Sequence, residues 1–421
     1  MVAREQTFHI PTRHLIFAFW EFVLAPQLAR RSDASCPCRE NFLGSYDRRA
    51  GLIRRRGPNK LEKNLPTMRP IPEIMRAAVL TGPAGIGQLL IRQVPIPEPK
   101  LGEVLVRVTM SGICGSDVHF VLDGTTETAY TPIILGHEAV GRVVALGDEV
   151  SRLAIGTRVS IVPLVTCMKC RHCLSGRTVL CEKRMCLGTD CEGAFAEYIS
   201  VPERNCLPVP DGLSDELAAV ATDSVATAYH AIAFRGGVKE GSRVAIWGTG
   251  GLGLSAVGVA RTLGASSIIA VDARPAARDW ALETGADEAY SPEEGLKRIN
   301  QLGGVDVAVE FVGKSATAEA AVRSLDHSGR AVIVGVGSQP LVGGRITSFV
   351  LREREVVGSY CSEPSEVAIC LDLLTSGRLV LPRVVGDTIG LDDVAEGVAR
   401  VQRGETGGGS RILVDVARMP S

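Results

Sequence analysis

The segment Gly-Thr-Gly-Gly-Leu-Gly at residues 248–253 constrains the fold of this chain more than any other feature. It follows an apolar, strand-like run at 243–248 and precedes a helix-like run at 251–264. Glycines at this spacing allow a tight turn and let a pyrophosphate approach the backbone, while the free N–H groups of the helix meet the anion. We therefore predict a dinucleotide-binding turn. Its predicted contact residues are Gly248, Gly250, Gly251, Leu252 and Gly253.

An acidic residue stands where the ribose of such a dinucleotide is expected. Asp272 ends the next strand-like run, 267–272, nineteen residues beyond Gly253. A carboxylate there accepts hydrogen bonds from the adenosine ribose hydroxyls and repels a 2′-phosphate, so we expect NAD rather than NADP. Arg274 and Arg278 lie close by and weaken this preference. A glycine turn with only a structural role is the alternative, and the combination of strand, helix and acid argues against it.

Strand-like and helix-like segments alternate through the second half of the chain. Apolar runs at 243–248, 267–272, 305–313 and 330–337 are separated by helix-like runs at 251–264, 276–285 and 316–325. Continuous apolar strands that alternate with helices are typical of a parallel sheet covered on both faces. The sequence therefore predicts an α/β fold with a doubly wound parallel sheet.

The first half has a different pattern. Short runs alternate apolar and polar residues at 102–112, 138–147 and 193–202, which predicts a β-rich lobe with long loops. An Ala-rich stretch from about Asp211 has helical spacing, with Asp211 or Ser214 as its N-cap. We expect the tail from about Cys361, which includes the strand-like run 411–416, to pack back on the first lobe.

Residues 1–74 differ from the rest of the chain. They carry about 13 Lys and Arg against 7 Asp and Glu, whereas the remainder carries about 33 against 40. The apolar run at 14–26 is too short for a membrane span and is interrupted by Glu21. The arginines would suit a transit peptide, but the acidic residues argue against one. We interpret 1–74 as a disordered or non-native leader, with the folded body starting near Met75.

The length of 421 residues favours two domains, and the formal net charge of -1 narrows the choice of partners. A near-neutral chain has no electrostatic footprint for nucleic acid or an anionic membrane, so we predict a small-molecule partner, no nucleic acid and no membrane. Twelve cysteines in a body of this size, several of them at metal-binding spacing, fit a reducing compartment better than a disulfide scaffold. We therefore expect a cytoplasmic protein.

Four cysteines between residues 167 and 181 are separated by two, two and seven residues. This spacing is strong evidence for a metal site, because cysteine thiolates at such short separations are typical zinc ligands. A redox pair and a zinc-ribbon module for nucleic acid are the alternatives, and the absence of basic, aromatic-rich surroundings disfavours both. The predicted ligands are Cys167, Cys170, Cys173 and Cys181.

A second group of possible metal ligands lies beside the first strand-like runs. Cys114 occurs in Gly-Ile-Cys-Gly-Ser-Asp-Val-His-Phe at 112–120, and His137 and Glu138 follow in a loop at 135–141. All three residue types bind zinc, although a single Cys or His is more often a core or surface residue than a ligand. The residues alone make this a candidate site and no more.

These stretches together resemble a known family. From about Met75 to the end, the chain is similar to the zinc-dependent medium-chain alcohol dehydrogenases, a branch of the medium-chain dehydrogenase/reductase superfamily. The matching stretches occur in family order at 112–119, 136–141, 167–181, 193–198, 222–231 and 248–253. The resemblance implies a chaperonin-10-like, or GroES-like, β-rich catalytic domain at 75–224, onto which 361–421 packs back. It also implies a Rossmann NAD-binding domain at 225–360.

The resemblance also implies roles for the possible metal ligands. Cys114 and His137 would bind a catalytic zinc, and the third ligand, often a second Cys in the family, falls on Asp223. Glu138 is an alternative or transient ligand in the family, so the choice between Asp223 and Glu138 stays open. Asp117 resembles the carboxylate that orients the ligand His. The four clustered cysteines would hold a second, structural zinc, which gives two Zn²⁺ per chain.

The implied reaction is the reversible oxidation of a primary or secondary alcohol to an aldehyde or ketone, by hydride transfer from a zinc alkoxide to NAD. Ser116 would bond to the alkoxide oxygen, and His119 would pass the proton to solvent. The resemblance further implies a homodimer or homotetramer. The positions that match nicotinamide-binding residues are Thr227, Val334, Gly335 and Val336.

Three other functions are compatible with part of this pattern. A sorbitol-like polyol dehydrogenase shares the motifs around Cys114 and His137, and that branch uses the Glu beside the His as a ligand. A quinone reductase of the same fold is disfavoured because those enzymes lack both zinc sets. A catalytically silent relative that acts as a binding protein is the alternative outside enzymes, and the presence of Cys114, His137, Ser116 and His119 together argues against it.

Overall fold

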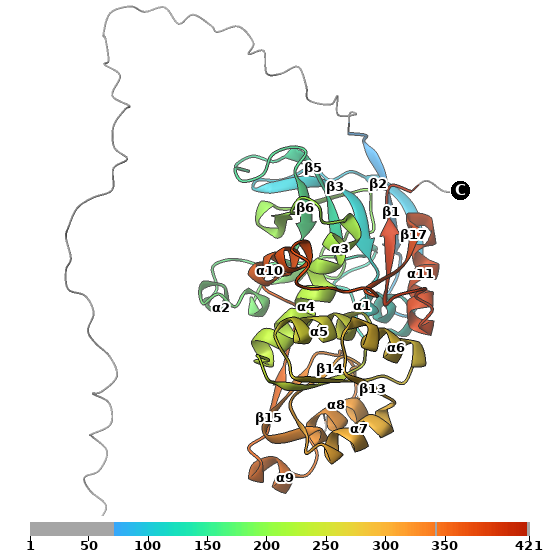
Figure 1. Ribbon diagram of the computed structural model, residues 1–421. Helices are drawn as coiled ribbons and strands as arrows, with labels where there is room; N and C mark the ends of the chain where they lie inside the picture. The colour runs from blue at the N-terminus through green and yellow to red at the C-terminus, as the bar shows by residue number, and fades with distance from the viewer. Residues whose placement is uncertain (1–70, 342, 419–421) are drawn as a thin grey trace, which may run out of the picture. The chain divides into compact units, whose positions relative to one another are not determined.

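The computed structural model describes residues 71–341 and 343–418 (Figure 1). The predicted leader at 1–74 therefore lies almost wholly outside the described residues. The first strand, β1, begins at Ile74. The described residues form a β-rich part with mainly antiparallel sheets and a second part with one parallel sheet. The predicted α/β fold class with a GroES-like part and a Rossmann part is therefore confirmed.

The β-rich part is built on a sheet with the strand order β10-β6-β5-β3-β18-β17, and β9 pairs with β3 beside this path. A smaller sheet has the order β2-β1-β4, and β7 pairs with β8. The strands are β1 Ile74–Leu80, β2 Leu89–Pro95, β3 Glu103–Gly112, β4 Ile133–Ile134, β5 Glu138–Leu146, β6 Arg158–Ile161, β7 Leu164–Val165, β8 Met185–Cys186, β9 Tyr198–Pro202, β10 Cys206–Pro208, β17 Val385–Gly390 and β18 Arg411–Asp415.

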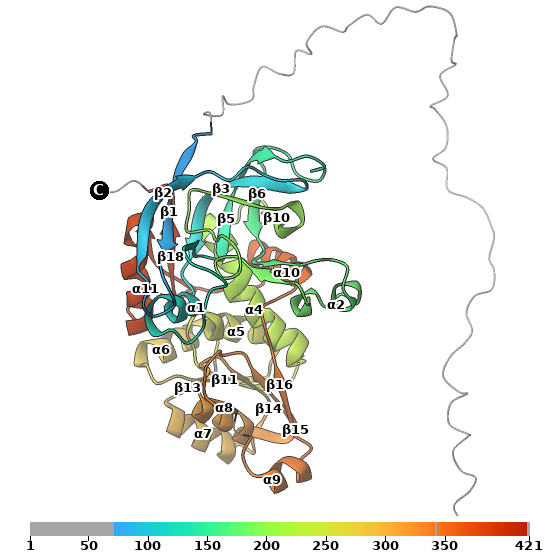
Figure 2. The same ribbon diagram turned by 180° about the vertical axis from the view of Figure 1, so that it is seen from behind.

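The tail of the chain completes this sheet. β18 pairs antiparallel with β3, with Leu413 opposite Gly112, and β17 lies parallel to β18 (Figure 2). Ile412 and Val414 of β18 are buried in the same hydrophobic core as apolar residues of β3 and β5, and Leu413 is buried in a second core with Met110 and Val140. Burial of this apolar surface is the main favourable contribution to the association of the tail with the first lobe.

The parallel sheet has the order β13-β12-β11-β14-β15-β16, and every neighbouring pair in it is parallel. This order reverses direction beside β11, where an open α/β sheet forms its binding crevice. The helix α5 follows β11 directly and packs against α6 and β12. The strands are β11 Arg243–Trp247, β12 Ser267–Val271, β13 Glu288–Tyr290, β14 Val305–Glu310, β15 Leu325–Ile333 and β16 Glu355–Gly358.

The helices α5 to α9 lie around the parallel sheet, whereas α1, α3, α10 and α11 lie beside the β-rich part or the helical connection (Figure 1). Their bounds are α1 Gly115–Val118, α2 Arg171–Leu174, α3 Asp215–Val220, α4 Ala226–Tyr229, α5 Gly251–Thr262, α6 Pro275–Thr284, α7 Pro292–Gln301, α8 Ser315–Arg323, α9 Ile346–Leu351, α10 Pro364–Thr375 and α11 Val394–Arg403. The elements β13 and α7 were not predicted, because the strand has three residues and the helix contains Gly295, a poor helix former.

The helical connection between the two parts is wound unevenly. α3 and α4 alternate with π-helical turns at Ala221–Val225 and His230–Arg235. The N-cap of α3 is Ser214, whose side chain accepts a hydrogen bond from the backbone N–H of Leu217. Ser214 rather than Asp211 therefore begins the helix. π-turns inside helices are often found at functional sites. Here the first of them carries Asp223.

The same stretch, Asp215–Arg235, is long and apolar enough to cross a membrane by length and composition alone. However, 78% of its apolar window is buried inside the protein, against α5, α10 and the β-rich sheet. A core helix of a globular protein has this property, so the stretch gives no support for a membrane span.

Candidate metal and coenzyme site

Four side chains with metal-binding atoms converge where the β-rich part meets the helical connection. Ligand atoms of Cys114, His137, Glu138 and Asp223 all lie within 4.8 Å of one another, and all four residues are buried. Cys114 precedes α1, His137 and Glu138 lie at the start of β5, and Asp223 lies on the π-helical turn. The cluster thus unites three segments that are far apart in the sequence.

The distances in this cluster fit a tetrahedral ion. The Oδ2 atom of Asp223 lies 3.7 Å from the Sγ atom of Cys114 and 3.8 Å from the Nε2 atom of His137. Ligands at normal zinc distances of about 2.0–2.3 Å are separated by roughly 3.3–3.8 Å in a tetrahedron. A thiolate, an imidazole and a carboxylate are also a donor set that zinc accepts. Cys114, His137 and Asp223 therefore fit zinc in both chemistry and spacing.

Asp223 is presented to this cluster by its neighbours. The hydroxyl of Thr227, one helical turn later, donates a hydrogen bond of 2.7 Å to its Oδ1 atom, which leaves Oδ2 facing Cys114 and His137. Burial would raise the pKa of Asp223, but the charges of His137 and Arg411 and the Thr227 hydrogen bond hold it below its ordinary value. Asp223 is thus an anion directed at the cluster.

Glu138 is engaged differently. Arg411, the first residue of β18, donates from Nε to Glu138 Oε2 at 3.1 Å and from Nη2 to Oε1. Both residues are buried, and Gly112 makes room for the carboxylate, because a Cβ at Gly112 would overlap Glu138 Oε2. Burial raises the pKa of Glu138 and the Arg411 guanidinium opposes this. The two oxygens of Glu138 are therefore hydrogen-bonded to Arg411, whereas Asp223 Oδ2, 3.7 Å from Arg411 Nη2, also lies 3.7 Å from Cys114 Sγ and 3.8 Å from His137 Nε2.

Asp117, which lies outside this cluster, acts on His137 through its charge and not through a hydrogen bond. The Nδ1 atom of His137 and the Oδ1 atom of Asp117 are both buried, and neither has a hydrogen-bond partner among the described residues. The other oxygen of Asp117 accepts the backbone N–H of Cys114 at 2.8 Å. Burial would lower the pKa of His137, but the charges of Cys114, Asp117 and Asp223 raise it well above its ordinary value. Asp117 thus supports both the Cys114 loop and the imidazole electrostatically.

The two residues expected to move a proton have different surroundings. Ser116 Oγ lies 3.4 Å from His137 Nε2, at the face of the cluster. The ring of His119 bonds through Nδ1 to Asp123 at 2.9 Å, and its side chain is 28% exposed. Ser116 is thus next to the cluster, and His119 is at the solvent side.

The glycine-rich turn has the expected shape. Gly248 has a left-handed φ of 88°, and a Cβ there would lie 2.5 Å from Val312. A Cβ at Gly253 would overlap the carbonyl oxygen of Gly248, so the helix α5 packs closely on β11. A Cβ at Gly250 would have open space, because the nearest atom outside its chain neighbours is Arg274 Nη2, at 3.7 Å. The turn is therefore tight at its ends and open in the middle, as a pyrophosphate requires.

The turn and the metal cluster are connected directly. A Cβ at Gly251 would lie 2.7 Å from the Nη1 atom of Arg411, so this guanidinium lies between the first residue of α5 and the cluster. Arg411 Nη2 is also 3.5 Å from Cys114 Sγ. Ser224, next to Asp223, donates a hydrogen bond of 3.2 Å to the carbonyl of Gly251. The dinucleotide turn and the metal ligands are thus parts of one site.

The remaining predicted coenzyme residues are at the same edge of the sheet. Val334, Gly335 and Val336 follow β15, and a Cβ at Gly335 would overlap Gly313, so the loops after β14 and β15 pack together. Val334 is buried and Val336 is 52% exposed. Leu252 lies in the first turn of α5, beside the hydrophobic core. Thr227 is buried and bonded to Asp223, so its hydroxyl belongs to the metal cluster.

Asp272 directly follows β12 and is tied to the glycine-rich turn. Its Oδ2 atom accepts the backbone N–H of Thr249 at 2.8 Å. Its Oδ1 atom accepts the backbone N–H of Arg274 at 2.9 Å and the Nε of the same residue at 3.2 Å. Burial would raise the pKa of Asp272, but these hydrogen bonds keep it below its ordinary value. The side chain is thus an anion fully engaged with the protein.

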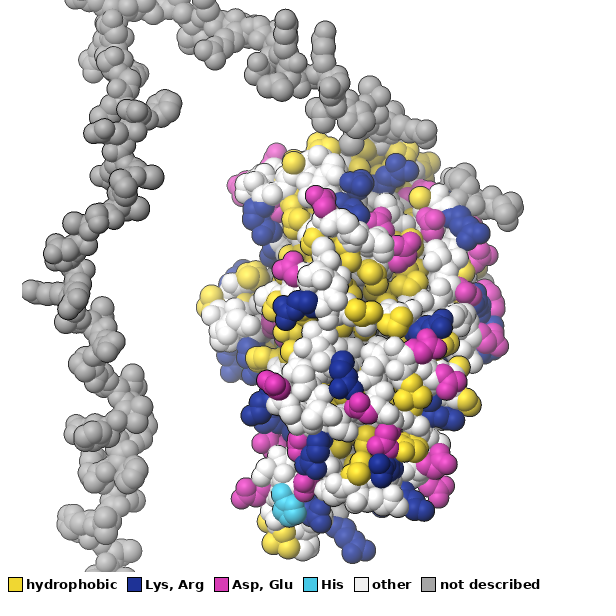
Figure 3. Space-filling model, viewed as in Figure 1, with side chains coloured by type: hydrophobic (Ala, Val, Ile, Leu, Met, Phe, Trp, Pro, Cys, Tyr) yellow, Lys and Arg dark blue, Asp and Glu magenta, His cyan; other side chains and the backbone are white. Residues whose placement is uncertain are grey.

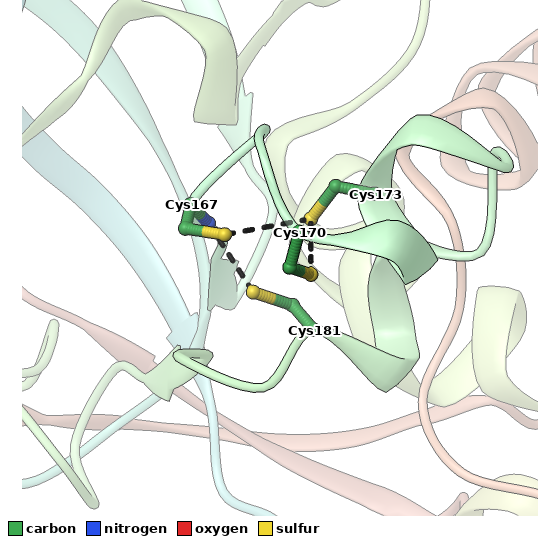
Figure 4. Close-up of side chains that lie close together, drawn as sticks. All are labelled: Cys167, Cys170, Cys173 and Cys181. Atoms are coloured by element: carbon green, nitrogen blue, oxygen red, sulfur yellow. Dashed lines mark hydrogen bonds between the residues drawn. The ribbon is translucent and has the colours of Figure 1, made fainter.

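The four clustered cysteines form a second group of metal-binding atoms, away from the turn (Figure 4). Their Sγ atoms lie within 4.8 Å of one another, with Cys170 to Cys173 at 3.6 Å and Cys167 to Cys173 at 4.0 Å. Four sulfurs at about 2.3 Å from one zinc would be roughly 3.8 Å apart. Backbone N–H groups of Cys173 and Glu182 lower the pKa of Cys170 to about 6, which favours a thiolate. This group therefore also fits zinc.

Sequence reasoning did not find three residues of the site. Arg411 was expected only as part of a strand, and Ser224 and Thr249 lay inside quoted motifs without a role. The sequence offered one signal for Arg411, because a charged residue that begins an otherwise apolar strand needs a partner when the strand is buried. Nothing in the sequence indicated that the partner would be Glu138, 273 positions away.

Comparisons with known proteins agree with this geometry. The family model described as alcohol dehydrogenase GroES-like domain matches residues 100–211, and the one described as zinc-binding dehydrogenase matches residues 251–376. The chain is 32% identical over 338 residues to a sorbitol dehydrogenase of Bacillus subtilis (strain 168), covering 78% of this chain and 94% of that protein. It is 32% identical over 329 residues to an L-threonine 3-dehydrogenase of Pectobacterium carotovorum, covering 75% and 94%.

A solved structure extends the likeness to three dimensions. A putative zinc-binding dehydrogenase from Sinorhizobium meliloti 1021, bound to NADP, matches with a TM-score of 0.74 and 30% identity, covering 82% of this chain and 99% of that one. The fold and these matches define an oxidoreductase with a zinc-binding dehydrogenase domain. The chain belongs to the zinc-dependent medium-chain dehydrogenase/reductase family, which confirms the resemblance found in the sequence.

Proposed function

We propose that this protein is a zinc- and NAD-dependent alcohol dehydrogenase that reversibly oxidises a primary or secondary alcohol to an aldehyde or ketone. The observation that carries this proposal is the convergence of Cys114, His137 and Asp223 beside Gly251 of the dinucleotide turn, with Arg411 between them. The proposed domains are a catalytic domain at 75–224, to which 361–421 is added, and a coenzyme domain at 225–360.

The residues have distinct proposed roles. Cys114, His137 and Asp223 would hold the catalytic zinc, and the four clustered cysteines would hold a structural one. A zinc ion held there supplies a Lewis acid that lowers the pKa of an alcohol, and NAD accepts the hydride. Ser116, at 3.4 Å from His137, would act as a relay that receives the alcohol proton while it gives up its own hydroxyl proton, and the partly exposed His119–Asp123 pair would release a proton to solvent. Asp272 would accept hydrogen bonds from the ribose of NAD.

Glu138 decides between this proposal and its closest alternative. A polyol dehydrogenase is supported by the sorbitol dehydrogenase relative, but the use of Glu138 as a metal ligand would require it to leave Arg411. The threonine dehydrogenase relative adds a secondary alcohol on an amino acid to the candidate substrates. We propose that Asp223 is the third ligand and Glu138 the partner of Arg411. We also propose a homodimer or homotetramer. A cytoplasmic location is supported by the ten described cysteines, which are free thiols.

A screen of NADH production tests the function. The purified, zinc-loaded full chain would be assayed with primary, secondary, aromatic and polyol alcohols and with L-threonine, and the Cys114→Ala variant would serve as the inactive control. We expect turnover of at least one of these alcohols, two zinc ions per chain, and retained NAD binding without turnover in the variant. Two bound zinc ions without any turnover would support a silent binding protein instead. Full activity of metal-free Cys114→Ala protein would overturn the proposed chemistry.

A further inference from the structure

Glu310, the last residue of β14, is a fully buried carboxylate that the proposed chemistry does not use. It lies opposite Trp247, the residue before the glycine turn, on the neighbouring strand β11. Its Oε1 atom accepts hydrogen bonds from the backbone N–H groups of Val312 at 2.8 Å and Gly313 at 2.9 Å and from the hydroxyl of Thr317 at 2.6 Å. Its Oε2 atom has no hydrogen-bond partner among the described residues. One oxygen atom therefore holds the loop that follows β14.

The backbone of the same residue holds a second loop. The carbonyl oxygen of Glu310 accepts the N–H groups of Val334 at 2.9 Å and of Gly335 at 3.1 Å. These two residues follow β15 and belong to the predicted nicotinamide contacts. Glu310 thus binds the loop after β14 through its side chain and the loop after β15 through its backbone.

The two loops are packed too closely to move independently. Gly313 has a left-handed φ of 78°, and a Cβ there would overlap the carbonyl oxygen of Val336. A Cβ at Gly337 would in turn overlap the carbonyl oxygen of Gly313. On the other side, Val312 leaves no room for a Cβ at Gly248 of the glycine turn. Because such close-packed contacts transmit strain, a shift of residues 312–313 would displace the loop at 334–337.

We propose that Glu310 is a positioning residue for the nicotinamide end of the coenzyme, and that its carboxylate fixes the loop at 334–336 by holding Val312 and Gly313 against it. This inference rests on the coenzyme site of the proposed function. Glu310 is buried and would act on the coenzyme only through these loops. The role matters for hydride transfer, because a misplacement of about 1 Å can lower a reaction rate by roughly a hundredfold.

NADH and ADP-ribose together test this role without any turnover, because ADP-ribose lacks only the nicotinamide ring of the coenzyme. Dissociation constants of both would be measured by calorimetry on the zinc-loaded full chain and on its Glu310→Met, Glu310→Gln and Glu203→Met variants. Glu203 is the matched control. It is a buried carboxylate of the β-rich part, and its Oε1 atom accepts the backbone N–H groups of Ser151 at 3.2 Å and Leu153 at 2.9 Å.

The two ligands should respond differently to the loss of Glu310. We expect the parent protein to bind NADH more tightly than ADP-ribose. Glu310→Met should weaken NADH about tenfold or more and ADP-ribose less than about twofold, because two backbone N–H groups at the nicotinamide end lose their acceptor. Glu310→Gln can keep an oxygen at the Oε1 position, so it should weaken NADH only about threefold, as expected for a neutral acceptor in place of a carboxylate. Glu203→Met should change neither constant.

Several outcomes would overturn the positioning role. An equal loss of affinity for both ligands in Glu310→Met would mean that Glu310 only maintains the fold of the domain. Unchanged affinities in a folded Glu310→Met protein, or a parent protein that binds NADH no more tightly than ADP-ribose, would also overturn it. If Glu310→Met does not fold, Glu310→Gln decides, and a ratio of the two constants equal to that of the parent protein overturns the role. If the parent protein binds neither ligand, the coenzyme site of the proposed function itself is wrong.

Discussion

Arg411 and Glu138 form a buried ion pair that joins β18 to the first residue of β5, next to His137, one of the proposed metal ligands. The same guanidinium lies 3.5 Å from Cys114 Sγ and against Gly251 of the dinucleotide turn. One side chain thus contacts Cys114, the glycine-rich turn and Glu138. Basic side chains are interspersed with acidic ones on the surface (Figure 3), so the interior position of Arg411 is unusual for a basic residue here.

Replacement of Arg411 by Met should destabilise the protein strongly. The buried carboxylate of Glu138 would lose its cation, and such a loss costs about 3–5 kcal/mol. The double variant Glu138→Leu/Arg411→Met should recover much of this, because no unpaired charge remains. Urea unfolding of the zinc-loaded proteins measures both. Equal destabilisation in the single and double variants would show that the ion pair is not the source of the effect.

Asp223→Asn should remove one of two zinc ions, whereas Glu138→Gln should keep both. The reason is that Asp223 Oδ2 faces Cys114 and His137, but Glu138 is bonded to Arg411. Metal content by atomic emission, on protein dialysed against a weak chelator, reports the stoichiometry. Loss of zinc from Glu138→Gln with full zinc in Asp223→Asn would reverse the assignment of the third ligand.

Cys170→Ser should lower the melting temperature by about 4 °C and remove one zinc ion, while leaving NAD binding close to that of the parent protein. A structural zinc site contributes directly to the free energy of folding, and a loss of a few kcal/mol in a chain of this size has about this effect. Scanning calorimetry and metal analysis provide the readouts. Cys206→Ala, a buried cysteine outside the cluster, is the control and should keep both zinc ions. An unchanged zinc content in Cys170→Ser would contradict the structural site.

Gly250→Ala and Gly253→Ala should fail for different reasons. A methyl group at Gly250 has open space and an ordinary φ of -74°, so we expect normal stability but NADH binding that is weakened tenfold or more, because the methyl group would occupy the pyrophosphate position. A methyl group at Gly253 would overlap the Gly248 carbonyl, so that variant should be destabilised as well. Fluorescence titration with NADH and thermal unfolding separate the two effects. Normal NADH binding by Gly250→Ala would place the pyrophosphate elsewhere.

A pH-dependent stabilisation is expected at the opposite edge of the parallel sheet. Arg243 pairs with Asp306 at 2.6 Å and with Asp326 at 2.9 Å, and the pKa values of both carboxyl groups lie below their ordinary range; burial opposes this shift for Asp306. A carboxyl group whose pKa is lowered on folding stabilises the fold at pH values above its pKa in the unfolded chain, which is near 4. This contribution is lost as the pH falls through the pKa of the group in the folded protein. Arg243→Gln should therefore cost about 1 kcal/mol at pH 7 and progressively less below about pH 4. Urea unfolding from pH 7 to pH 3 measures this difference in the free energy of unfolding. A difference that stays constant over this range would contradict the stabilising role of the ion pairs.

Much of the architecture follows from local patterns in the sequence. The apolar runs of β11, β12 and β14 and the glycine turn before α5 were predicted within a few residues, because each depends on neighbouring positions only. The predicted strand at 330–337 ends at Ile333, since the residues after it form the loop that packs on Gly313. The predicted strand at 193–202 begins only at Tyr198. Ends of elements depend on tertiary contacts, which explains these differences.

The sequence by itself indicated which residues form the glycine-rich turn and which offer thiol, imidazole and carboxylate groups, because these features are encoded by residue type and short spacing. Only the tertiary structure decided how these groups combine. Whether Asp223 or Glu138 faces Cys114 depends on Arg411, which follows Glu138 by 273 positions and reaches it through the pairing of β18 with β3. The net charge around Asp272 likewise depends on where the Arg274 side chain lies. Contacts between distant segments arise from packing of the whole chain, and no local pattern specifies them.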